Sequence, residues 1–131
     1  MPRVPWRKCA AIAAGIEEIA FTDHYEFYAG EITGKYFNRE YLIRYFEELD
    51  KCRQMYEGRL IIRSAMEFGQ LHLDPEKASG IIKSWPFDYL IGSVHKIGNI
   101  DLSQMEFRED TVQEIADAYY SHLLKLARTG D

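Results

Sequence analysis

The segment YLIGSVH (residues 89–95) decides the fold, because an apolar stretch of strand-forming residues leads directly into a histidine. Aromatic and β-branched residues over positions 89–94 predict a β-strand. Two earlier segments have the same form: residues 16–22 (IEEIAFT) end at Asp23 and His24, and residues 59–67 (RLIIRSAME) end at Glu67. We therefore predict three strands, each ending at a side chain that can bind a metal ion.

Helical segments lie between the predicted strands. Residues 6–14 predict a first helix, and Gly15 stands where glycine commonly ends one. Asn38 is a suitable N-cap for a second helix, which Gly58 ends. Apolar residues at helical spacing predict the buried face of this second helix; they are Leu42, Tyr45, Phe46, Leu49 and Tyr56.

Two further helices follow the second strand. Asp74 is a predicted N-cap, and Pro75 takes the first helical position, where proline is tolerated. This helix extends to about residue 84, where a Trp-Pro pair ends it. Thr111 and Glu114 have the spacing of a capping box and predict the start of the last helix. Its expected buried stripe consists of Val112, Ile115, Tyr119, Leu123 and Leu126.

The alternation of strands and helices predicts an α/β fold. Strands joined through helices pair in parallel by right-handed crossovers. Three strands are too few to close a barrel, which usually has about eight. We therefore expect one domain, residues 1–131, that forms an arc of a barrel or a small open sheet. A helix without a neighbouring strand stands at each end of the sequence, so we expect an arc truncated on both sides.

Composition argues against several classes of protein. The formal net charge is −5 and the basic residues are scattered, which disfavours a nucleic-acid-binding surface. No apolar run approaches the roughly 18 residues of a membrane span, and the apolar stretch at 9–14 does not predict a signal peptide. We expect a cytoplasmic protein. Cys9 and Cys52 lack metal-type spacing, so buried thiols are their expected role.

Metal-competent side chains, His24, Glu67 and His95, mark the ends of the predicted strands. The C-terminal ends of neighbouring parallel strands lie side by side, so these groups can converge. Two imidazoles and a carboxylate suit Zn, Mn or Fe, and a carboxylate can bridge two ions. Each residue alone also has an ordinary structural interpretation, as a hydrogen-bonded loop histidine or a solvated turn glutamate. Their shared rim favours a divalent-metal site.

Other candidates stand near the same rim. His72 follows the second strand and could reach the site, whereas His122 lies within a helix and is expected to be solvated. Three aromatic residues next to the first strand could wall a pocket, although packing is the commoner role of such side chains; they are Tyr25, Phe27 and Tyr28.

Three segments carry a resemblance to a known family: GIEEIAFTDH (15–24), SAMEFGQLHLDPE (64–76) and FDYLIGSVHKIGNIDL (87–102). They resemble successive motifs of histidinol phosphatases of the polymerase-and-histidinol-phosphatase (PHP) family, and the resemblance covers essentially the whole chain. It implies a distorted (β/α)7 barrel with a trinuclear metal site at its C-terminal rim. It further implies hydrolysis of a small phosphate monoester, histidinol phosphate being the suspected one, and a place in histidine biosynthesis.

The resemblance also implies roles for four residues. His24, in the Thr-Asp-His motif, matches a metal ligand. Glu67 matches the carboxylate that bridges two metals, and His95 matches a ligand of one of that pair. Asp23 takes the motif's acidic position and is expected to support a ligand by hydrogen bonding. The predicted metal ligands are therefore His24, Glu67 and His95, and the predicted catalytic residues are Glu67, His95 and Asp23.

Departures from the family pattern bear on activity. Family members carry a His-x-His pair and a further histidine before this region, and Gly-His and Asp-x-His motifs after it; this sequence has none of these motifs. Ala65 also replaces a usual glycine, which is a minor change. With three ligands carried over, no metal has the three protein ligands typical of a catalytic zinc site. We therefore predict weak metal binding and little phosphatase activity by this polypeptide alone.

Two other functions stay open. The chain could be a non-catalytic partial barrel that self-associates as a homo-oligomer, since uncovered strand edges and apolar helix faces favour pairing. It could instead be a nuclease-type PHP domain like those attached to bacterial DNA polymerases. The acidic net charge and the Gly-Gln-x-His string at 69–72 disfavour the nuclease.

Overall fold

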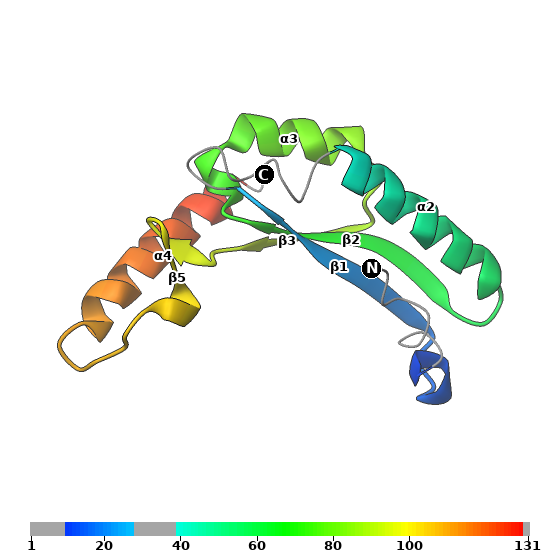
Figure 1. Ribbon diagram of the computed structural model, residues 1–131, viewed down its shortest axis with the longest axis horizontal. Coiled ribbons are helices and arrows are strands. Elements are labelled where there is room, and N and C mark those ends of the chain that lie inside the picture. Colours follow the sequence, from blue (N-terminus) through cyan, green and yellow to red (C-terminus); the bar gives the residue numbers. More distant parts are fainter. Residues whose placement is uncertain (1–9, 28–38, 130–131) are drawn as a thin grey trace.

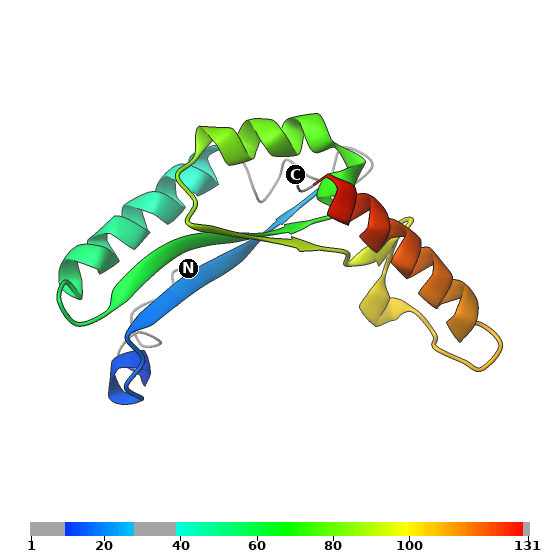
Figure 2. The ribbon, with the colours of Figure 1, turned by 180° about the vertical axis from the view of Figure 1, so that it is seen from behind.

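The computed structural model describes residues 10–27 and 39–129. Its main sheet has three parallel strands in the order β1-β2-β3, which confirms the predicted α/β arrangement. Figure 1 shows α2 and α3 on one side of this sheet, with α4 at one end of the molecule, and Figure 2 shows the same from behind. The elements that build this layer are β1 (Glu18–Glu26), α2 (Arg39–Met55), β2 (Ile61–Gly69), α3 (Pro75–Ser84), β3 (Tyr89–Ser93) and α4 (Val112–Arg128).

The sheet has one face covered by helices and one that is open among the described residues. Side chains alternate between the two faces of a strand, and on the covered face of β2 Ile62, Ser64, Met66 and Phe68 are all buried. They pack against apolar residues of α2 and α3, notably Leu42, Leu49 and Ala78. Ile61 begins the opposite set and is 51% exposed. Glu67, at an odd position of β2, therefore belongs to the open face.

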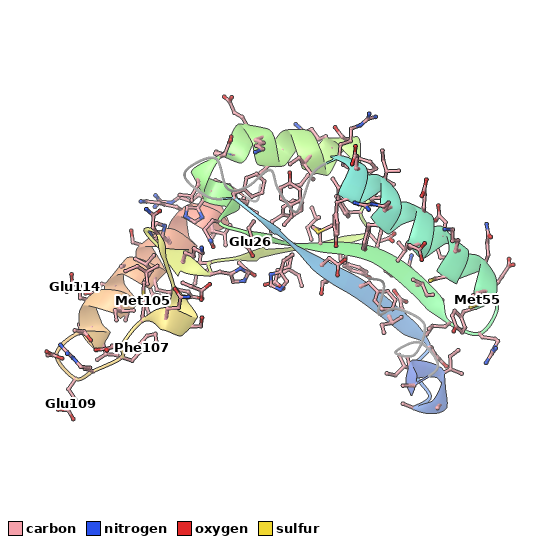
Figure 3. All side chains as sticks on the ribbon, in the orientation of Figure 1. Glu26, Met55, Met105, Phe107, Glu109 and Glu114 are labelled. Atoms are coloured by element: carbon pink, nitrogen blue, oxygen red, sulfur yellow. The ribbon has the colours of Figure 1, made fainter. Side chains whose placement is uncertain are left out.

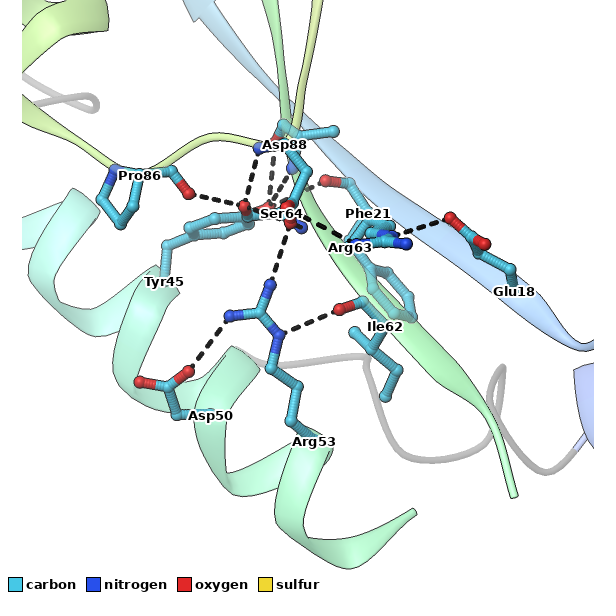
Figure 4. Close-up of polar contacts among 11 residues, drawn as sticks. Glu18, Phe21, Tyr45, Asp50, Arg53, Ile62, Arg63, Ser64, Pro86 and Asp88 are labelled. Carbon is cyan, nitrogen blue, oxygen red and sulfur yellow. Dashed lines mark hydrogen bonds and ion pairs between the residues drawn. The ribbon is translucent and has the colours of Figure 1, made fainter. Parts of the chain in front are cut away.

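A polar network ties the start of β3 to β2 and α2 (Figure 4). One Asp88 carboxylate oxygen accepts hydrogen bonds from the Ser64 backbone N–H at 2.7 Å, from its hydroxyl at 2.8 Å, and from Arg53 at 3.0 Å. Burial alone would raise the pKa of Asp88, but these donors and the charge of Arg63 outweigh it, and the pKa is lowered. In the same view the Tyr45 hydroxyl accepts from the Ala65 N–H at 2.9 Å.

Some of the predicted helix ends are present in the structure, and others are not. Gly15 has a φ of 74°, as a C-terminal glycine requires, after helical residues 10–13. Asp74 caps α3 by accepting from the Lys77 N–H at 3.1 Å. The predicted capping box at α4 is wrong, because Thr111 makes no side-chain capping bond and its hydroxyl instead donates to the Glu106 carbonyl at 3.0 Å. The predictions on residues 6–9, Tyr28 and Asn38 lie outside the described residues.

The predicted buried stripe of α4 is largely wrong. Leu126 is buried and packs over Gly92 of β3, where an added Cβ would lie 3.3 Å from it. Val112 and Leu123 are 46% and 37% exposed. Ile115 and Tyr119 are only half-buried, so Leu126 is the one member of the predicted stripe that is buried among the described residues.

A short hairpin follows β3. Its strands are β4 (Lys96–Ile97) and β5 (Ile100–Asp101), and Gly98 turns the chain between them with a φ of 61°. There are also two short 3-10 helices among the described residues: η2 (Leu71–Leu73) follows β2, and η3 (Leu102–Gln104) follows the hairpin. Within the described part of the chain, no helix has the length and apolarity needed to cross a membrane.

Candidate metal centre

The structure brings His24, Glu67 and His95 together at one end of the sheet. His24 and Glu67 are register partners on β1 and β2. The Glu67 carboxylate lies between the two imidazoles, with Oε1 2.8 Å from Nε2 of His95 and Oε2 3.6 Å from Nε2 of His24. The two rings have their centroids 5.1 Å apart. The convergence inferred from the strand ends is therefore present in the fold.

Glu67 is held in this position from β3. The Ser93 hydroxyl donates to Glu67 Oε1 at 2.9 Å, across the pair formed by the neighbouring strands. Burial alone would raise the pKa of Glu67, but the bonds from Ser93 and His95 and the charge of His24 outweigh it. The pKa of Glu67 is lowered, so the group is an anion at neutral pH and a ready cation ligand.

His95 lies two residues beyond the end of β3 and depends on Gln70 for its place. The Gln70 side-chain oxygen accepts from the His95 backbone N–H at 2.6 Å, and the Gln70 N–H donates to the Ser93 carbonyl at 2.8 Å. Gln70 is 2% exposed and adopts a left-handed φ of 58°, an uncommon conformation for a residue other than glycine. Sequence reasoning missed this residue, since a glutamine after a strand gives no signal of a buried role.

Glu26 is the other residue that sequence reasoning missed. Its Oε1 lies 2.7 Å from Nδ1 of His95 and 3.2 Å from Nδ1 of His24, so one oxygen contacts both imidazoles. The side chain is 12% exposed. Its signal was positional: Glu26 stands two residues after His24 and shares its face, provided that the strand continues past residue 22. The predicted end of that strand was four residues too early.

The paired carboxylates set the charge state of His95. Burial alone would lower the pKa of this imidazole, but hydrogen bonds and charges from Glu26 and then Glu67 outweigh it. The pKa of His95 is therefore raised. Each of its ring nitrogens faces a carboxylate oxygen, so the site stabilises positive charge at this position.

Asp23 does not join this group, and its predicted role in supporting a ligand is corrected. Successive side chains of a strand point to opposite faces, which puts Asp23 on the helix-covered side, away from its neighbour His24. There it accepts a hydrogen bond from the Tyr41 hydroxyl of α2. Burial and then this carboxylate raise the pKa of Tyr41. Asp23 therefore connects β1 to α2.

The remaining candidate residues have structural roles. His72 does not reach the rim: its Nε2 lies 2.8 Å from Nδ1 of His122, which corrects the expectation that His122 is merely solvated. Burial lowers the pKa of His72, and His122 and Lys125 lower it further. Tyr25 and Phe27 are buried in the core rather than lining a pocket, and Cys52 is a buried free thiol.

An open pocket of about 420 Å³ lies beside the paired histidines. The β4–β5 hairpin and η3 form its far wall, closed by a hydrogen bond from the Leu102 N–H to the His95 carbonyl at 2.9 Å. The residues that line it are His24, Glu26, His95, Asp101, Leu102 and Ser103. A small molecule that enters this pocket lies directly against the imidazoles.

The donor set fits a divalent metal. Two imidazoles and two carboxylates are ligands that Zn, Mn and Fe accept. Ligand atoms of His24, Glu26 and His95 all lie within 4.8 Å of one another, and Glu67 lies on the other side of the same rings. Among the described residues, no hydrogen-bond donor reaches the enclosed Oε2 of Glu26. The carboxylates concentrate negative charge at this site, and a bound cation would balance it.

Fold and site together define the class of protein, and a family model agrees: the PHP domain matches residues 9–131. The chain belongs to the PHP domain family.

Two curated relatives are more specific. A histidinol-phosphatase of Lactococcus lactis is 34% identical over 111 residues, which cover 84% of this chain and 40% of that protein. A probable histidinol-phosphatase of Deinococcus radiodurans is 29% identical over 126 residues, covering 92% of this chain and 48% of that protein. The chain thus spans less than half the length of the curated relatives it matches.

A solved structure is also similar. The histidinol phosphate phosphatase of Lactococcus lactis, crystallised with zinc, L-histidinol and phosphate, superposes with a TM-score of 0.59 and 32% identity. The match covers 75% of this chain and 36% of that one. The three-stranded sheet with its helices is therefore consistent with part of a PHP barrel.

Proposed function

We propose that this chain carries part of the metal centre of a phosphate monoester hydrolase of the histidinol-phosphatase type. One observation carries the proposal: His24 and His95 meet around the carboxylate of Glu67, which lies 2.8 Å from His95. The two relatives named as histidinol phosphatases, and the structure holding histidinol and phosphate, support the substrate class. They favour the phosphatase over the nuclease.

The residues have separate tasks in this proposal. His24, Glu67 and His95 would together hold the divalent metal ions, with Glu67 between the two histidines. Such ions bind phosphate oxygens and lower the pKa of a bound water, which supplies the nucleophile for hydrolysis. Ser93 orients Glu67, and Gln70 fixes the backbone of His95. The pocket beside the histidines would admit the phosphate monoester.

The number of ligands limits what a polypeptide of these 131 residues can do alone. Tight catalytic zinc sites usually have three protein ligands for one ion. Here each imidazole has one partner carboxylate on its Nε2 side. We therefore expect weak metal binding and little hydrolysis by this polypeptide alone.

An assay of the purified polypeptide tests both statements. Phosphate release from histidinol phosphate would be measured with Zn or Mn, next to the full-length Lactococcus lactis enzyme. We expect release far below that of the full-length enzyme. Equal rates would contradict the limit on activity, and a polypeptide that binds neither metal by elemental analysis would contradict the metal centre.

A second candidate, self-association of a non-catalytic partial barrel, rests on the apolar residues of the β3 edge. Tyr89, Leu90 and Ile91 are 54%, 42% and 44% exposed, and β3 pairs with β2 alone among the described strands. Unpaired apolar strand edges commonly bind a further strand. Light scattering should then show dimers or larger species; a monomer at high concentration would exclude this candidate.

A further inference from the structure

The structure assigns a positioning role to Glu26: its carboxylate fixes both His24 and His95 through their Nδ1 atoms and so directs the Nε2 atoms toward Glu67. This inference rests on the proposed metal centre and goes beyond it, because Glu26 is not among the ligands that the sequence motifs predict. Figure 3 labels Glu26, which is the last residue of β1.

The two carboxylates contact opposite sides of the same imidazoles. Glu26 uses one oxygen, Oε1, for both Nδ1 atoms, at 2.7 Å and 3.2 Å. Glu67 uses a different oxygen for each Nε2 atom. A single oxygen can accept two N–H bonds with its two lone pairs, whereas each Glu67 oxygen faces a different imidazole. The geometry therefore gives the protons to the Glu26 side and the metals to the Glu67 side.

A hydrogen bond to the second ring nitrogen of a histidine ligand has a general effect on metal binding. A histidine ligand usually donates its second ring N–H to a carboxylate or carbonyl, which fixes its tautomer and makes the ligand nitrogen more basic. Here one carboxylate does so for two ligands from different segments, a strand and the loop after β3. The side chain of Glu26 is 12% exposed against 54% for His24, so the more buried group holds the more exposed one.

The Glu26 carboxylate occupies space that is open because Gly69 has no side chain. Gly69 is the register partner of Glu26 at the ends of β1 and β2. A Cβ added at Gly69 would lie 2.0 Å from Glu26 Oε2 and 2.5 Å from its carboxyl carbon. Those atoms are the far end of a flexible side chain, so Gly69→Ala should displace the carboxylate rather than disrupt the sheet. The chain thus offers a way to move Glu26 without mutating it.

Imidazole NMR of the 131-residue chain tests the inference directly. With ¹⁵N-labelled histidine at high pH and without metal, His24 and His95 should carry their proton on Nδ1, and with zinc they should bind it through Nε2. In Glu26→Gln and Gly69→Ala we expect mixed tautomers and a loss of zinc affinity of roughly 10–100-fold, the usual effect of removing such a partner. Zinc affinity would be measured by competition with a chelator.

Two controls separate this effect from general damage. Glu18→Gln removes a carboxylate from the same face of β1, where Glu18 pairs with Arg63 at 2.7 Å. Gly80→Ala adds a Cβ in α3 that meets nothing within 4 Å. Both should keep the wild-type tautomers and zinc affinity.

The outcomes are distinct. Zinc bound through Nδ1, with Glu26 as a direct ligand, would overturn the inference, as would unchanged tautomers in Glu26→Gln. Circular dichroism must show that the variants fold, and Gly69→Ala provides a second route if Glu26→Gln does not. Nδ1 protonation that depends on Glu26, in a chain that binds neither zinc nor manganese, would uphold the positioning role of Glu26 while the proposed metal centre fails.

Discussion

The molecule contains two histidine pairs of similar spacing and opposite surroundings. The rings of His24 and His95 lie 5.1 Å apart, and those of His72 and His122 lie 5.0 Å apart. The first pair stands between two carboxylates, which raise the pKa of His95. The second pair faces the positive charge of Lys125, and burial lowers the pKa of His72.

The difference shows what turns neighbouring imidazoles into a cation site. Ring proximity alone produces a neutral hydrogen-bonded pair, because two positive charges in contact repel. Carboxylates on both sides of the rings reverse this preference and favour a proton or a metal. The first pair is therefore a metal-site candidate, and the second fastens η2 to α4.

The largest expected effect is a difference in zinc affinity between a variant of the first histidine pair and a variant of the second. His95→Gln should weaken zinc binding by at least about 100-fold, above the range for losing an outer hydrogen-bond partner. His122→Gln should leave zinc affinity unchanged, since that ring bonds to His72 rather than to a residue of the metal centre. Isothermal titration of both variants measures the contrast. Comparable losses in the two variants would show that the pairs are not distinct.

A variant that is less stable should not for that reason also bind zinc more weakly. Asp88→Ala leaves the buried Ser64 N–H without its acceptor at the start of β3. An unsatisfied buried donor costs about 1–3 kcal/mol, so chemical denaturation should show a decrease of this order in the free energy of unfolding. Zinc affinity, measured where the variant is folded, should match wild type; a parallel loss would mean that the start of β3 and the metal centre are coupled.

The smallest expected effect is the pH dependence of the second pair. Because the folded pKa of His72 lies below its ordinary value of 6.5, the unfolded chain takes up the proton first as pH falls. The stability due to the neutral pair is fully present above pH 6.5 and is lost as pH falls toward the lower folded pKa. Unfolding of metal-free protein at pH 5.5 and 7.5 should therefore show a smaller difference in His72→Gln than in wild type. An equal or larger difference would contradict the assignment.

The sequence predicted the three strands because their residue types and the helices between them are local signals. It also placed His24, Glu67 and His95 on one rim, since parallel strands joined by helices must end on the same side. The class of site followed from the identity of those side chains.

Other residues had no local signal. Gln70 acts through a backbone contact to His95, 25 residues away, and Asp23 is next to His24 in sequence but on the other face of the sheet. The apolar stripe of α4 has the period of a buried helix, yet burial depends on whether another element lies against it. Periodicity describes one element and contains no information about its neighbour.

The sequence by itself thus determined the order of elements and the identity of the metal-competent groups, because strand and helix formation depend on nearby residues. Only the tertiary structure decided which carboxylate meets which ring nitrogen. Glu26 reaches both imidazoles because β1 continues past residue 22 and because Gly69, on the adjacent strand, has no side chain to exclude it.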